Sequence, residues 1–204
     1  MAAGRLSAAI RGESAVADAF SYLSVLISIV LGLGVTQVLT GFGRVIEARD
    51  RVRMYGPALI WAAVILLIHI QTWWVLFGLR VHQDWTFGAF LMVLLQPLVL
   101  YLLAALALPT EFGGGSPVDL RAHYERHAPW FFGIAVLLLV QSVTRDLVLN
   151  GALPSVANLA AHVVFLVLWA GAAFTRRSGY HWFVAVATAA LFSLYVAALF
   201  APLR

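Results

Sequence analysis

Eight polar or titratable side chains stand inside long apolar runs of this chain, where such groups are costly and therefore informative. They are His69, Gln71, Gln96, Gln141, Arg145, Asp146, Asn158 and His162. Imidazole and carboxylate groups can carry protons or bind a solute, and amides can hydrogen-bond a solute or join helices. The set therefore indicates either a polar cavity within the apolar region or a series of helix–helix contacts.

The densest group of these side chains lies between residues 141 and 146. Gln141 and Arg145 are four residues apart, as are Ser142 and Asp146, so each pair is expected to share one helix face. Three interpretations fit this spacing: a helix end whose Arg145 reaches the lipid headgroups, an internal ion pair between helices, or a solute or proton site. The pattern favours the helix end.

Two histidines lie deep in apolar runs. His69, followed by Gln71, is expected near the bilayer midplane, either as an imidazole hydrogen-bonded to a neighbouring helix or as a proton-relay or ligand residue. His162 lies four residues after Asn158, so the two share a face that could meet the group at 141–146. For both histidines, helix packing is favoured over a functional role.

The dipeptide Gln96-Pro97 interrupts a third apolar run near its middle. Proline lacks the backbone N–H that continues a helix, so a kink is expected there, and the Gln96 side chain could satisfy the carbonyl that the kink frees. Interrupted helices near the midplane occur in transporters. A simple kink is the commoner explanation.

Histidine spacing gives no support for a metal or cofactor. His69 and His82 are 13 residues apart, the spacing at which one helix can hold two stacked haems, but no histidine follows His162 at that distance to supply a second pair. His123 and His127 share a face, but no third ligand accompanies them. The chain has no Cys and no Lys, which excludes thiolate sites and lysine Schiff bases. The sequence indicates no catalytic residue and no cofactor.

The elements that must position these groups are long apolar segments. Of 204 residues, 63% are apolar and 11% are charged, against roughly 45–50% and about 25% in an ordinary soluble domain. The runs are continuous and not alternating, so helices in lipid explain them better than a barrel. Six runs are long enough to span a bilayer: about 20–39 (with helix extending to 46), 58–79, 87–108, 130–149, 156–174 and 180–199. We therefore predict an all-α, polytopic transmembrane bundle of about six helices, forming one integral membrane domain over residues 1–204.

The longest loop is predicted to carry a short surface helix over residues 117–127. Ser116 resembles an N-cap, followed by proline in the first turn. On such a helix Tyr124 would face inward, and Arg121 could pair with Glu125 four residues on.

Arginine placement predicts the orientation in the membrane, because cytoplasmic loops carry an excess of basic residues. The loops after the first, third and fifth runs hold eight arginines, and the opposite side holds five. This distribution favours non-cytoplasmic termini in a multi-pass protein of a bacterial-type inner membrane. The eight arginines are Arg44, Arg49, Arg51, Arg53, Arg121, Arg126, Arg176 and Arg177.

Three functions are compatible with this pattern. A small transporter or channel for a solute or ion predicts that His69, Gln96, Arg145 and His162 converge on a cavity. A non-catalytic accessory or scaffold subunit of a membrane complex predicts a dry bundle with an apolar partner face. A membrane haem protein or enzyme would need a convergent ligand or acid–base set, in which Asp146 is the deep carboxylate.

The expected partner is the lipid bilayer. Glycines in the first run, among them Gly32 and Gly34, are compatible with a homo-oligomer or a partner in a membrane complex, since small residues let helices approach closely. The pI of about 10.0 is explained by loop arginines and does not indicate nucleic-acid binding.

Overall fold

The computed structural model describes residues 2–81, 85–112 and 117–200, and six long helices dominate this part of the chain. Each of the six is long and apolar enough to cross a membrane, so the prediction of an all-α transmembrane bundle is confirmed and the chain is a multi-pass membrane protein. The helices are α1 (Ala2–Glu47), α2 (Gly56–Phe77), α3 (Phe87–Ala107), α4 (Leu120–Asn150), α5 (Val156–Phe174) and α6 (Ser178–Phe200). Shorter elements are η1 (Arg49–Arg51), β1 (Val52–Arg53), η2 (Gly78–Val81) and β2 (Val118–Asp119).

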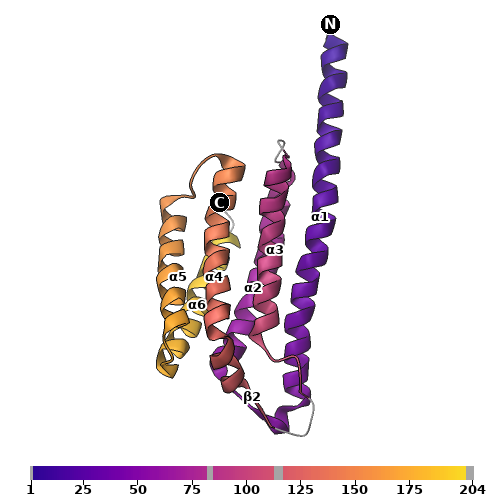
Figure 1. Cartoon of the computed structure of the whole chain (residues 1–204). Coiled ribbons are helices and arrows are strands. Elements are labelled where there is room, and N and C mark those ends of the chain that lie inside the picture. The colour runs from indigo at the N-terminus through magenta and orange to yellow at the C-terminus, as the bar shows by residue number, and fades with distance from the viewer. Residues whose placement is uncertain (1, 82–84, 113–116, 201–204) are drawn as a thin grey trace.

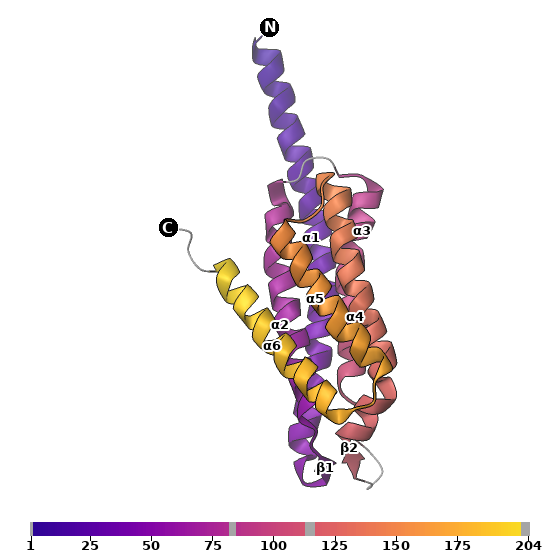
Figure 2. The same cartoon turned by 90° about the vertical axis from the view of Figure 1, so that its left-hand side faces the viewer.

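The helices form two layers. In the first layer α1, α3, α4 and α5 follow one another side by side, and in the second layer α2 packs against α6 (Figure 1). The N-terminal part of α1 projects beyond the rest of the bundle, and the C-terminal half of α6 leans away from it (Figure 2). The two layers are therefore packed less closely where α6 diverges.

Local turn chemistry explains where several helices begin and end. Thr86 caps α3, because its Oγ1 accepts a hydrogen bond from the Ala89 N–H at 3.1 Å, and Ser155 caps α5 in the same way. Gly151 ends α4 with a φ of 63°, a left-handed conformation that glycine adopts without strain. The predicted break between the fourth and fifth spans is confirmed.

The prediction of a separate surface helix over 117–127 is wrong. Val118 and Asp119 form β2, which pairs in parallel with β1, so the chain is extended where that helix was expected to begin. Asp119 caps α4 instead, and its Oδ1 accepts from the N–H groups of Arg121 and Ala122 at 2.9 and 3.0 Å. Ser116, the predicted cap, lies outside the described residues.

From this cap α4 runs without interruption through Pro129 to Asn150. A single buried stripe at helical spacing explains the continuity, because it continues across the proline and fixes both parts of the helix against the core. Its first members are Leu120, Tyr124, Ala128, Phe131 and Phe132. Two finer predictions hold: Tyr124 is buried, and Arg121 pairs with Glu125 at 2.7 Å.

An aromatic cluster packs α2, α4 and α5 together. The Trp61 ring of α2 lies 5.3 Å from that of Phe132 on α4 and 5.8 Å from that of Trp169 on α5, both in edge-on geometry. Nearby, His181 links α6 to α4, since its Nε2–H donates to the Thr175 carbonyl and its Nδ1 accepts from the Tyr124 hydroxyl at 3.0 Å. These contacts fix the helices near the end at which α4 begins and α5 joins α6.

A close contact between α1 and α2 depends on one glycine. His69 is 1% exposed, and its Nδ1–H donates to the Ile65 carbonyl at 2.8 Å. The rest of the ring lies against the backbone of Gly34, where an added Cβ would come within 2.8 Å of the His69 Cδ2 and overlap the Nε2. Gly34 thus provides the space for the imidazole.

We expect Gly34→Ala to lower the free energy of unfolding by about 1–3 kcal/mol, because the added methyl group overpacks a site whose ring is held by a hydrogen bond. Unfolding by detergent titration in mixed micelles measures the loss. The matched control is Gly32→Ala on the same helix, where a Cβ meets nothing within 4 Å. Adding His69→Ala should restore part of the stability lost in Gly34→Ala. Equal losses for the two glycine variants would contradict the packing explanation.

Candidate functional site

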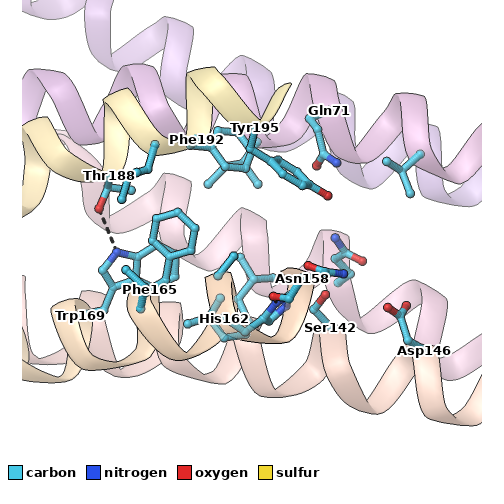
Figure 3. Close-up of a pocket in the computed structure, with 18 of the residues that line it drawn as sticks. Gln71, Ser142, Asp146, Asn158, His162, Phe165, Trp169, Thr188, Phe192 and Tyr195 are labelled. Carbon is cyan, nitrogen blue, oxygen red and sulfur yellow. Dashed lines mark hydrogen bonds between the residues drawn. The ribbon is translucent and has the colours of Figure 1, made fainter. Parts of the chain in front are cut away.

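A cavity of about 310 Å³ lies between the two layers, lined by side chains from α2, α3, α4, α5 and α6. In Figure 3, Gln71 and Tyr195 stand on one wall, and Ser142, Asn158 and His162 stand on the facing wall. The other lining residues are Ile68, Val75, Gln96, Leu138, Leu139, Arg145, Asp146, Ala161, Val164, Phe165, Trp169, Thr188, Leu191 and Phe192. The structure thus brings together six of the eight polar side chains named from the sequence: Gln71, Gln96, Arg145, Asp146, Asn158 and His162.

The polar end of the cavity is organised by Arg145. Its Nε and Nη2 donate to Oδ1 of Asp146 at 3.2 and 2.9 Å, and its Nη1 donates to Oε1 of Gln96 on α3. The Gln96 Nε2 in turn donates to the Thr72 hydroxyl of α2 at 3.4 Å. The side chains of Arg145 and Asp146 are only 13% and 21% exposed. Arg145 therefore turns inward and joins α4 to α3, and Gln96 extends this network to α2. The side chain does not extend to the lipid headgroups, as the favoured interpretation of the sequence expected.

On α5, Asn158 and His162 face the cavity together. The Nδ1–H of His162 donates to the Asn158 carbonyl at 2.8 Å, which leaves Nε2 as the ring nitrogen available to a ligand. Within the described residues, the side chains of Asn158, Gln71, Ser142 and Tyr195 make no hydrogen bond to other protein groups. A solute or water in the cavity can therefore form hydrogen bonds with these amide, hydroxyl and imidazole groups.

The opposite end of the cavity is apolar. The Trp169 Nε1–H donates to the Thr188 hydroxyl at 3.1 Å, and this bond joins the two walls (Figure 3). Phe165 and Phe192 lie beside it and line the space with aromatic carbon. The indole N–H already has its acceptor, so this end presents mainly apolar surface to a ligand.

Two of the eight predicted side chains lie elsewhere. His69 contacts α1 as described above, and its Nε2 has no hydrogen-bond partner within the described residues. Gln141 is 3% exposed and its Nε2 donates to the Met92 carbonyl of α3 at 2.7 Å. Both are helix contacts in this structure and not part of the cavity wall.

Pro97 lies inside α3, which continues on both sides of it. The hydrogen bonds of the neighbouring polar side chains differ from those expected from the sequence. Helical geometry pairs the N–H of residue 97 with the carbonyl of Val93, so proline frees that carbonyl. The Gln96 side chain does not turn back to its own backbone but reaches Arg145 and Thr72. It is Gln141, from α4, that hydrogen-bonds the neighbouring backbone at Met92.

The surface histidines have ordinary structural partners. The rings of His123 and His127 are in contact, with centroids 4.3 Å apart and planes tilted by 36°. Their ring N–H groups donate to the carbonyls of Leu106 and His123 respectively. His82 lies outside the described residues. Across the described residues, no group of three or more His, Cys, Asp or Glu side chains is placed to hold a metal ion.

Sequence reasoning missed the contribution of α6 to the cavity. Thr188, Phe192 and Tyr195 line it together with Trp169 of α5. Thr188 carried a usable signal, since a hydroxyl within an apolar run needs a partner. The aromatic residues carried none, because Phe, Tyr and Trp occur on lipid-facing and buried sides of a helix alike.

No protein family, no curated protein and no solved structure matches this chain. The fold and the cavity therefore define its class on their own. The chain is a multi-pass membrane protein whose described residues form six helices of spanning length, and five of these helices line a partly polar cavity.

Proposed function

We propose that the protein is a small transporter of a bacterial-type inner membrane, which binds its solute in the cavity between α2, α3, α4, α5 and α6. The observation that carries this proposal is the meeting of six polar side chains from four helices at one space of about 310 Å³. Ordinary helix packing would bury such groups against each other, whereas here several amide, hydroxyl and imidazole groups face the cavity. A scaffold subunit would need only a dry bundle, so the cavity favours transport.

The arginine distribution supports an orientation for the transporter. The eight arginines that follow the first, third and fifth predicted spans are all exposed. Three of them lie within helices, Arg44 in the last turn of α1 and Arg121 and Arg126 near the start of α4. The segments that carry them gather at the end of the bundle where α1 finishes and α4 begins (Figure 1). By the excess of basic residues in cytoplasmic loops, this end faces the cytoplasm and the termini lie on the other side. The polar end of the cavity, near the C-terminal end of α4, then lies in the non-cytoplasmic half of the bilayer.

The natural absence of cysteine makes water access to the cavity directly measurable. We expect Asn158→Cys to react with a membrane-impermeant cationic methanethiosulfonate at least tenfold faster than Val163→Cys, because only a hydrated thiol ionises readily. Val163 is the matched control: it lies on the same helix, is 53% exposed and does not line the cavity.

The same variants in sealed, oriented vesicles test transport. A transporter that alternates between two openings exposes Asn158→Cys to reagent from either side of the membrane in turn. Reaction from both sides supports the proposal. Reaction from one side alone, or rates equal to those of Val163→Cys, would refute transport through this cavity.

A further inference from the structure

The cavity is graded in polarity along the axis of the bundle. On α5 the polar Asn158 and His162 come first and Phe165 and Trp169 follow deeper, and on α4 Leu138 is deep while Asp146 lies nearer the helix end. Half a bilayer has the same gradient, with headgroups outside and hydrocarbon inside. A molecule with a polar head and an apolar tail would therefore lie in the cavity in the orientation that it already has in the membrane.

The flank of the cavity reaches the lipid-facing surface between α5 and α6. Val164 of α5 and Leu191 and Tyr195 of α6 line the cavity and are also 47%, 42% and 40% exposed. The C-terminal half of α6, which carries the last two, leans away from the bundle (Figure 2). A ligand dissolved in the bilayer can enter between these side chains without leaving the hydrocarbon.

Charge at the polar end indicates the kind of head group. Arg145 and Asp146, the charged residues of the lining, cancel each other. The guanidinium keeps N–H groups beyond its bonds to Asp146 and Gln96, and the carboxylate keeps its Oδ2, to which no described residue donates within hydrogen-bond distance. A donor and an acceptor of opposite charge side by side match a head group that carries both charges.

We infer that the ligand of this cavity is a single-chain zwitterionic amphiphile that enters sideways from the bilayer between α5 and α6. The volume of about 310 Å³ corresponds to roughly ten water-sized groups, which accommodates part of one chain and a head group but not a two-chain lipid. This inference rests on the proposed function, since it names the substrate class of the same cavity.

A photoreactive lipid tests the inference on the full chain in nanodiscs. The reagent is lysophosphatidylethanolamine with a diazirine in its acyl chain, and the labelled residues are mapped by mass spectrometry. We expect labelling at Phe165 and Trp169 that excess unmodified lysophosphatidylethanolamine suppresses. Val164→Trp, which narrows the flank, should reduce it at least fivefold, whereas Val163→Trp, one position away and outside the cavity, should leave it unchanged.

A second variant tests the preference for a zwitterionic head group. Asp146→Asn removes the carboxylate charge and leaves that of Arg145, so labelling by the anionic lysophosphatidylglycerol analogue should rise at least fivefold relative to the zwitterionic one. An unchanged ratio would overturn the zwitterion assignment. Gel filtration of each variant in detergent checks that it remains folded.

The two proposals fail in different ways. The amphiphile inference is overturned if labelling is equal in Val164→Trp and Val163→Trp, or if Phe165 and Trp169 are not labelled. In that case the proposal of transport still stands, for a water-soluble solute, provided that Asn158→Cys reacts from both sides. Flank-dependent labelling in a protein whose Asn158→Cys reacts from one side only supports the amphiphile site and refutes transport.

Discussion

Replacing Arg145 with alanine is expected to lower the free energy of unfolding by about 3 kcal/mol, because it leaves a largely buried carboxylate without its cation. Asp146 is 21% exposed and receives both hydrogen bonds from the guanidinium on the same oxygen. The Gln96 Oε1 would lose its donor as well. We expect a loss of stability at the lower end of the range for buried ion pairs, since water in the cavity can partly solvate the carboxylate. Detergent unfolding titration measures it.

Two variants separate the ion pair from the simple loss of a long side chain. Arg145→Ala combined with Asp146→Ala should recover much of the stability, because a buried pair replaced as a whole is often close to neutral. Arg145→Lys should be intermediate, since a single ammonium cannot reach Asp146 and Gln96 in the geometry of a planar guanidinium. A double variant no more stable than Arg145→Ala would show that the pair is not the stabilising unit.

The second large effect is expected from Phe132→Ala, which should cost about 3–5 kcal/mol of unfolding free energy. Phe132 is 0% exposed. Its ring centroid lies 5.3 Å from that of Trp61, 6.4 Å from that of Tyr124 and 5.8 Å from that of His181. Truncation leaves a cavity among three helices that cannot close without moving them. The transition midpoint in detergent unfolding provides the measurement.

The matched control for Phe132→Ala is Phe183→Ala. Phe183 lies in the span of α6 and is 58% exposed, so its ring already faces lipid and its removal creates no internal void. We expect a loss below about 1 kcal/mol for this variant. Losses of similar size at both positions would mean that the aromatic cluster does not dominate packing at this end of the bundle.

Together these variants examine the two ends of one bundle. Near the arginine-rich loops, Trp61, Phe132 and His181 pack the helices into a buried aromatic core. Toward the opposite end α6 diverges from the bundle (Figure 2). There the polar network of Arg145 borders a cavity. Close packing at one end leaves the other end as the place where a ligand can be accommodated.

Much of the architecture could be predicted from the sequence because apolar length is a local property. The predicted fifth span, 156–174, has the same bounds as α5. The predicted third span, 87–108, ends one residue later than α3. Turn residues such as Gly151 act through their own backbone conformation, so they could also be read locally. The start of α4 was mispredicted because the pairing of Val118 with Val52 joins segments far apart in the chain.

The polar site was only partly accessible from the sequence. The cost of a polar group in lipid singled out Arg145, Asp146 and His162 without reference to any neighbour. The free-energy cost of the polar group is the same whether its hydrogen-bond partner lies on a neighbouring helix or is a bound solute. The sequence therefore could not indicate which side chains line the same cavity. Adjacent residues on a helix do not normally face each other, and the pairing of Arg145 with Asp146 was not expected from their spacing.

By itself, then, the sequence determined that the chain forms apolar helices, where most of them end, and which side chains are costly inside them. Each of these follows from the free energy of single residues in lipid or in a turn. Only the tertiary structure decided that Gln96 joins Arg145, that His69 contacts Gly34 instead of the cavity, and that α6 completes the cavity wall. Those outcomes depend on how six similar apolar surfaces pack together. In lipid that choice rests on shape and interhelical hydrogen bonds, which no single segment encodes.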